Sequence, residues 1–230
     1  FTFYIRNYKL IGAGFFWLMY GVAFGLSILA FISDQNFLIA LVSIITLALL
    51  VESIYNKKRI KDINSLLVGS FCVVLMTIFL GIYTYSLSQD KNIDFIWLEV
   101  IRFYSGAALL GGVTTAMLLG HWYLVQPGLS RKPIADMCTV CLIALLVNAA
   151  LWLFHPSMIS VLNGNISDGW GGTLGYMWLG SAITTLVLMF AASRALKERS
   201  YSAVMATTGL LYLAILVANG VELIPRAIFS

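Results

Sequence analysis

Seven long apolar runs divide this chain, and most of the lysines and arginines between them fall in every second loop. The runs cover residues 10–32, 37–55, 65–86, 96–125, 137–160, 172–194 and 201–224. A helix needs about 20 apolar residues to cross the hydrocarbon core of a bilayer, which is about 30 Å thick. Each run is close to this length or longer. The pattern therefore predicts an all-α, polytopic integral membrane protein, a bundle of seven transmembrane helices.

The composition leaves little chain for anything else. Apolar residues make up 60% of the chain and charged residues 10%, and the mean hydropathy is +0.92, which is far from the norm for soluble domains. We therefore expect one transmembrane helical domain over residues 1–230, without a soluble domain that could hold an active site. A protein of this kind is not expected to be catalytic on its own.

The basic residues predict the orientation. Those of the favoured side are Arg6, Lys9, Lys57, Lys58, Arg59, Lys61, Arg131, Lys132, Arg194, Lys197 and Arg199. The opposite side has only Lys91 and Arg226, together with Arg102 inside a run. Because cytoplasmic loops are enriched in Lys and Arg, seven spans place the N-terminus in the cytoplasm and the C-terminus outside.

These loops also explain the net charge of +4, so no nucleic-acid partner is expected. Membrane lipids and other membrane subunits are the partners that we expect. The predicted location is a cell membrane crossed several times, such as a bacterial inner membrane or its equivalent.

Small residues recur within two of the runs. Gly21 and Gly25 form a GxxxG pattern, and Gly106, Gly111 and Gly112 lie in the fourth run. Small residues let helix backbones approach closely in a membrane. They predict internal helix packing, with association between copies as the alternative.

Ionisable residues inside the runs are the strongest functional signal, because charge is costly in hydrocarbon. A polar cluster is predicted toward the outer side, where helical periodicity brings residues of runs four, five and seven onto inward faces. Its members are Glu99, Arg102, Asn148, Asn219, Glu222 and Arg226, with His155 at the same depth. Either the cluster is a charge-paired knot that holds the helices together, or it is a proton path or substrate pocket.

A second candidate site lies at the cytoplasmic end of the fourth run. His121, Trp122, Tyr123, Gln126 and Arg131 place hydrogen-bond donors beside aromatic rings at an interface. Such a corner suits a quinone head group, whose carbonyls accept hydrogen bonds. Anchoring of the helix by Trp and Tyr explains the same residues.

The two histidines, His121 and His155, raise the possibility of haem b. One haem between them is ruled out by depth, because about 14 residues, or about 20 Å of helix, separate them. A haem would need a single axial ligand, a methionine ligand or a ligand from another subunit. Quinone and haem b therefore remain the two candidate cofactors.

Cys138 and Cys141 form a CxxC pattern at the start of the fifth run. This spacing can lower the pKa of a thiol and support redox exchange. A four-cysteine zinc site would need a second pair, so no metal site is predicted.

The function favoured by these features is an integral membrane subunit of a larger complex, in a respiratory or electron-transfer setting. It would bind a quinone, haem or lipid at a helix-bundle site or act as a scaffold. A proton-coupled transporter or channel that uses the polar cluster is the alternative. A membrane thiol oxidoreductase that uses Cys138 and Cys141 is the second alternative.

Overall fold

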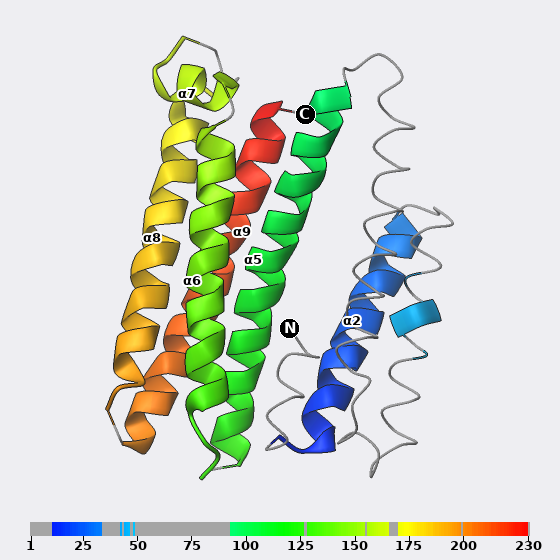
Figure 1. Cartoon of the computed structure of the whole chain (residues 1–230), viewed down its shortest axis with the longest axis vertical. Coiled ribbons are helices and arrows are strands. Elements are labelled where there is room, and N and C mark those ends of the chain that lie inside the picture. The colour runs from blue at the N-terminus through cyan, green and yellow to red at the C-terminus, as the bar shows by residue number, and fades with distance from the viewer. Residues whose placement is uncertain are drawn as a thin grey trace. The chain divides into compact units, whose positions relative to one another are not determined.

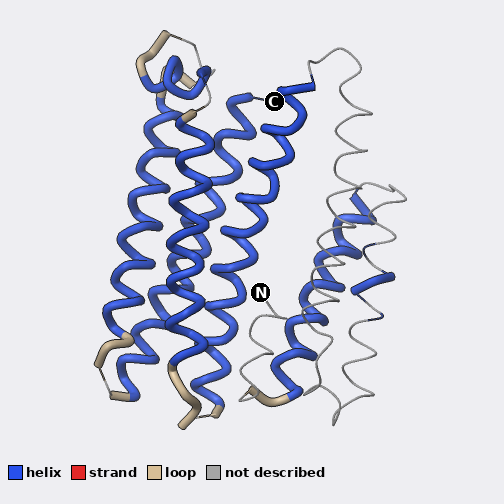
Figure 2. Tube along the Cα trace, viewed as in Figure 1, coloured by secondary structure: helices blue, strands red, loops and turns tan. Residues whose placement is uncertain are grey.

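The computed structural model describes residues 11–33, 42, 44–46, 48, 93–126, 128–154, 156–165, 170–198 and 200–229. In this part of the chain every regular element is a helix and no strand occurs (Figure 2). The chain divides into two compact units, Phe1–Asp90 and Lys91–Ser230, and each is described by itself. The all-α class is thereby confirmed for the described residues, and the single domain stays a prediction.

The first unit contains helix α2, Ala13–Ser33, which corresponds to the predicted run 10–32. The Ser27 hydroxyl donates to the carbonyl of Phe24 in the same helix (2.8 Å) and lies 3.2 Å from the hydroxyl of Thr46. The predicted runs 37–55 and 65–86 lie outside the described residues, except for residues 42, 44–46 and 48, which are helical.

The second unit is an antiparallel four-helix bundle with one short extra helix. Its elements are α5 (Ile93–Val125), α6 (Lys132–Leu153), α7 (Pro156–Leu162), α8 (Thr173–Ala195) and α9 (Tyr201–Phe229). Helix α5 packs against α6 and α9, and α8 packs against the same two helices, so the four long helices close into a ring (Figure 1). The short loops between α5 and α6 and between α8 and α9 favour antiparallel neighbours, and the longer α6–α8 connection contains α7.

These four helices are long and apolar enough to cross a membrane, over Val100–Val125, Lys132–Leu153, Thr173–Ala195 and Tyr201–Phe229. A shorter apolar stretch, Gly14–Ala30, lies in α2. The count of seven spans and the sides of the two termini remain predictions.

Two predicted runs differ from the helices in their bounds. The run 137–160 is in fact two helices: α6 begins earlier and ends at Leu153, and α7 begins at Pro156. Proline lacks the N–H for a helical hydrogen bond and disfavours helical geometry in the residue before it, so the break falls here. The run 201–224 is too short, because α9 continues to Phe229 with Pro225 inside it.

Close helix crossings in the bundle use small residues. A Cβ atom on Gly120 of α5 would lie 2.7 Å from the Thr208 hydroxyl of α9, and one on Gly220 of α9 would lie 2.7 Å from the Ser181 hydroxyl of α8. Side chains at these positions would force the helices apart. In the described residues, no atom lies within 4 Å of the corresponding position on Gly21 or Gly25, and the packing role of this GxxxG stays a prediction.

An apolar cluster closes the end of the bundle at which α7 lies (Figure 1). Trp152 of α6, Met158 of α7 and Trp178 of α8 are its buried core, and Leu162, Ile224 and Phe229 pack against it. We call this group the aromatic cap.

Candidate functional site

Four polar residues from three helices meet just below the aromatic cap. Ser105 is on α5, Asn148 on α6, and Glu222 and Arg226 on α9; together we call them the polar layer. Ser105, Asn148 and Glu222 are buried, with exposed fractions of 8%, 0% and 2%. Because α5 runs antiparallel to both α6 and α9, its first half lies beside the C-terminal ends of those two helices (Figure 1).

Asn148 is the central donor of the polar layer. Its amide nitrogen donates one hydrogen bond to the Ser105 hydroxyl (3.0 Å) and another to Oε1 of Glu222. The Ser105 hydroxyl in turn donates to the carbonyl of Arg102 (2.8 Å). A single side chain of α6 therefore joins α5 to α9. The Oδ1 atom of Asn148 is buried and has no hydrogen-bond partner among the described residues.

Glu222 is an acidic group in the interior, and Arg226 balances its charge. The Nη2 and Nε atoms of Arg226 donate to Oε2 of Glu222 over 3.0 and 3.4 Å. The Arg226 side chain is 44% exposed, whereas that of Glu222 is 3% exposed. An unpaired buried charge is strongly destabilising, and this pair avoids it while leaving the cation at the edge of the bundle. The Arg226 guanidinium also lies over the ring of Phe103, 5.4 Å from its centroid.

Gly106 makes room for the Glu222 carboxylate. A Cβ atom at this position of α5 would overlap the carboxylate carbon and both carboxylate oxygens. Any other residue here would displace Glu222 from Asn148. The glycine is therefore part of the polar layer's geometry, although it donates and accepts nothing through a side chain.

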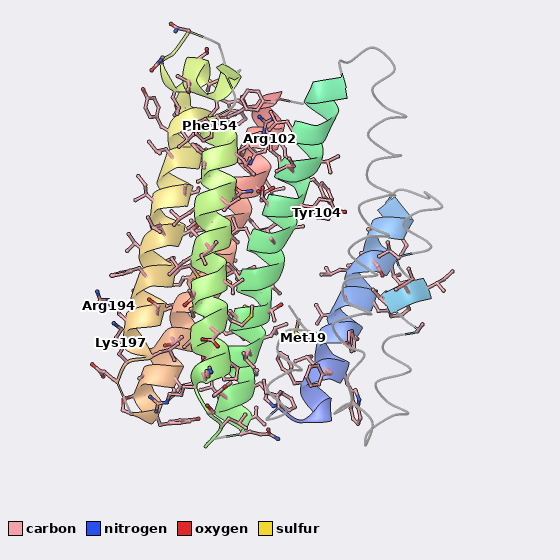
Figure 3. The ribbon with its side chains drawn as sticks, in the orientation of Figure 1. Met19, Arg102, Tyr104, Phe154, Arg194 and Lys197 are labelled. Carbon is pink, nitrogen blue, oxygen red and sulfur yellow. The ribbon has the colours of Figure 1, made fainter. Side chains whose placement is uncertain are left out.

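Arg102 connects the polar layer to the aromatic cap. It is 4% exposed, its Nε donates to the carbonyl of Leu151 (3.4 Å), and its guanidinium lies 5.3 Å from the centroid of Trp152. The Trp152 ring stacks on Phe229, with centroids 6.1 Å apart. Cation–π contact of this kind is favourable where water is excluded. Figure 3 shows Arg102 at the same end of the bundle as Phe154, opposite Arg194 and Lys197.

Pro225 changes the hydrogen bonding of α9 beside Glu222. A proline has no N–H, so the carbonyl four residues earlier, that of Val221, receives no helical hydrogen bond. The indole N–H of Trp178 on α8 donates to this carbonyl over 3.2 Å. A proline inside an apolar helix is thus compensated from the neighbouring helix, as membrane helices require.

The polar layer lies close to one end of the bundle. Asn148 is five residues before the end of α6, or about 7.5 Å along the axis, and Glu222 is seven residues before the end of α9, or about 10 Å. If these helices cross a bilayer, the layer is within one to two helical turns of its surface.

The structure brings three of the six predicted cluster residues into contact: Asn148, Glu222 and Arg226. The Arg102 side chain is buried but contacts Leu151 and Trp152, and only its backbone carbonyl accepts a hydrogen bond from Ser105 of the polar layer. Asn219 does not join them, because its amide donates to the carbonyl of Ile215 in its own helix (2.8 Å). Glu99 belongs to α5, but its side chain lies outside the described residues, as does His155.

Sequence reasoning missed the roles of Ser105 and Trp178, whereas Gly106 was expected at a close helix contact but not beside Glu222. Ser105 precedes its contact partner by 43 positions, so no local pattern relates them. Pro225 gave a usable signal for Trp178, since a freed carbonyl in an apolar helix requires a donor from elsewhere.

At the other end of the bundle, the predicted His121–Arg131 corner is held together largely by internal contacts. Trp122 donates to the Gln126 side chain (3.2 Å), and the Tyr123 hydroxyl donates to the carbonyl of Ser130. Arg131 donates to the carbonyls of Glu198 and, over 3.0 Å, Ser200. His121 is exposed. The Arg131 side chain therefore connects the α5–α6 loop to the α8–α9 loop through hydrogen bonds.

Cys138 and Cys141 are free thiols with exposed fractions of 0%. They face the interior of the bundle rather than an aqueous surface. This burial gives a partner protein no access to either sulfur.

The described residues contain no group of three or more His, Cys, Asp or Glu side chains that could hold a metal ion. His121 is near the end of α5, whereas the chain reaches position 155 only after α6 has crossed the bundle. A haem held by both histidines of one chain is therefore not favoured by the helix arrangement.

Comparisons with protein-family models, curated proteins and solved structures give no match for this chain. The described residues define an all-helical fold in which four helices are long and apolar enough to span a membrane. In the described residues, the polar layer and the Arg131 contact are two sites where polar side chains connect different helices or loops.

Proposed function

We propose that this protein is a non-catalytic integral subunit of a larger membrane complex, with electron transfer as its setting. In this proposal the chain crosses a cell membrane seven times, with its N-terminus in the cytoplasm and its C-terminus outside. The one-sided distribution of Lys and Arg supports that topology.

The observation that supports a scaffold role most directly is the hydrogen bonding of the Glu222 carboxylate. Both of its carboxylate oxygens accept hydrogen bonds from within the bundle, one from Asn148 and the other from Arg226. Groups that are satisfied by their neighbours stabilise a helix arrangement, and they leave little hydrogen-bonding capacity for a ligand. At the opposite end, the Arg131 guanidinium likewise forms its hydrogen bonds within the protein, to the carbonyls of Glu198 and Ser200.

Quinone and haem b remain the cofactors that we propose for the complex. The His121–Arg131 corner is the candidate quinone or lipid site, because His121 is exposed there next to the partly exposed Trp122. His155 is the candidate for a haem ligand shared with another subunit.

The test is purification of the chain from its own membrane in a mild detergent. Stable co-purifying subunits, with or without a haem absorption band, would support the proposal. A protein that elutes alone, without chromophore or partner, would contradict it.

A proton-coupled transporter is the second candidate, and the buried Oδ1 of Asn148 favours it. This acceptor has no partner in the described residues although it belongs to the residue that holds Glu222. Transport predicts solute-dependent proton movement in liposomes that contain the chain alone, and loss of that movement in Glu222→Gln. Neither effect is expected of a scaffold.

A further inference from the structure

Basic residues from two distant loops meet at the end of the bundle opposite the aromatic cap. The α5–α6 loop and the start of α6 contribute Arg131 and Lys132, and the end of α8 with the following loop contributes Arg194 and Lys197. The loops are adjacent because the Arg131 guanidinium donates to the carbonyls of Glu198 and Ser200. Figure 3 shows Arg194 and Lys197 together at this end.

Two lysines flank this contact between the loops. Lys132 directly follows Arg131, and Lys197 directly precedes Glu198, whose carbonyl Arg131 binds. Both lysines are exposed. A lysine has a flexible four-carbon stem and three donors, so each of these two lysines can extend its ammonium group toward an anion beside the Arg131 contact.

The charge at this end is unbalanced. Among the described side chains, the four basic ones of Arg131, Lys132, Arg194 and Lys197 outnumber the two acidic ones of Asp136 and Glu198, and the sequence of the α8–α9 loop adds Arg199. In the described part of the chain, no carboxylate lies within ion-pair distance of Lys132 or Lys197. The two lysines therefore have their charge available for an external partner.

The surface beside these basic residues carries exposed apolar and aromatic side chains. Val125, Phe190 and Tyr201 are exposed by 63%, 52% and 47%, and the Arg194 guanidinium lies over the Phe190 ring, 4.9 Å from its centroid. Exposed apolar and aromatic side chains beside cationic groups are typical of the level of lipid head groups.

We infer that this end of the bundle binds the phosphate of an acidic phospholipid, with Lys132 and Lys197 as the cationic donors and Arg131 as the residue that positions them. The inference rests on the proposed function only in requiring that the four helices lie in a bilayer. Negatively charged lipids supply the charge that the loops lack, and basic residues near a membrane surface attract them.

The experiment compares lipids retained by the full chain after reconstitution into nanodiscs with equal amounts of phosphatidylglycerol and phosphatidylcholine. After extraction into mild detergent, mass spectrometry measures the ratio of the two bound lipids. We expect enrichment of phosphatidylglycerol, reduced about five-fold by Lys132→Gln and by Lys197→Gln. Glu198→Gln is the matched control: it removes an acidic group from the same loop, so enrichment should stay equal or rise.

Equal retention of both lipids by the unmodified chain, or unchanged enrichment in the double lysine variant, would overturn the inference. A site for free phosphate predicts a different result. Inorganic phosphate would then bind the detergent-solubilised protein in a lysine-dependent way, without any preference between the two lipids. That result would also overturn the inference. Co-purifying subunits are counted in the same samples. Loss of lipid selection with subunits retained contradicts only this inference, and selection without subunits contradicts only the proposed function.

Discussion

The indole of Trp178 donates a hydrogen bond to the carbonyl of Val221, over 3.2 Å and across the interface between α8 and α9. This carbonyl is the one that Pro225 leaves without a partner inside α9. The two helices are thus joined at the position where one of them lacks a backbone donor, one residue before the buried Glu222.

Trp178→Phe should lower the free energy of unfolding by about 1–3 kcal/mol, because the Val221 carbonyl loses its donor in a buried position. Pro225→Ala restores a backbone N–H at that site, so Trp178→Phe should cost less in the Pro225→Ala background. A double-mutant cycle in mixed micelles measures the difference. Equal costs of Trp178→Phe in both backgrounds would show that the two residues are not coupled through this carbonyl.

Gly106→Ala should destabilise the bundle by about 1–3 kcal/mol, because the new methyl group overlaps the Glu222 carboxylate and forces a shift. Gly209→Ala is the matched control, since Gly209 is also helical but no atom lies within 4 Å of its Cβ position. Thermal unfolding of the purified proteins compares the two. Similar losses in both variants would contradict the close approach of Gly106 to Glu222.

Asn148→Leu should cost about 1–3 kcal/mol, because it removes the donor shared by Ser105 and Glu222 in the buried layer. Asn219→Leu tests the same change at an asparagine whose amide bonds only to its own helix, and its effect should be smaller. Unfolding free energies of both variants decide the point. An equal effect at Asn219 would mean that the cost comes from the substitution type and not from the polar layer.

Arg131→Ala should lower stability by about 0.5–1.5 kcal/mol, because the α5–α6 loop loses its hydrogen bonds to the α8–α9 loop. His121→Ala, at an exposed neighbour of the same corner, should leave stability unchanged. Loss of a bound quinone, lipid or subunit in His121→Ala would instead indicate recognition at this corner. The readouts are unfolding temperature and the composition of the purified sample.

Single cysteines at positions 132 and 197, in a chain without its native cysteines, should be labelled from the same side of the membrane. The antiparallel bundle puts these positions at one end, and Asn163, next to α7, at the other. A cysteine at position 163 should therefore react only from the opposite side. A cysteine at position 58 extends the test to seven spans, which require it to share the side of position 197; labelling from the other side would contradict that count.

The sequence alone was enough to establish the all-helical class and to locate most of the helices in the second unit. These features can be predicted because each spanning helix needs about 20 apolar residues, so the length and composition of one segment are enough to identify it. Expected burial also followed from local pattern: the cost of charge in hydrocarbon predicts inward positions for Arg102 and Glu222, and the structure buries both.

Tertiary structure decided which of these polar residues touch. Helical periodicity groups Asn219 with Glu222 on α9, yet only Glu222 accepts a hydrogen bond from Asn148. The Asn219 amide donates instead to the carbonyl of Ile215 in the same helix. The difference depends on how α5 packs against both α6 and α9, and Gly106 lets α5 approach Glu222 closely there. Contacts between residues 43 or 74 positions apart follow from helix packing, which no single run of sequence specifies.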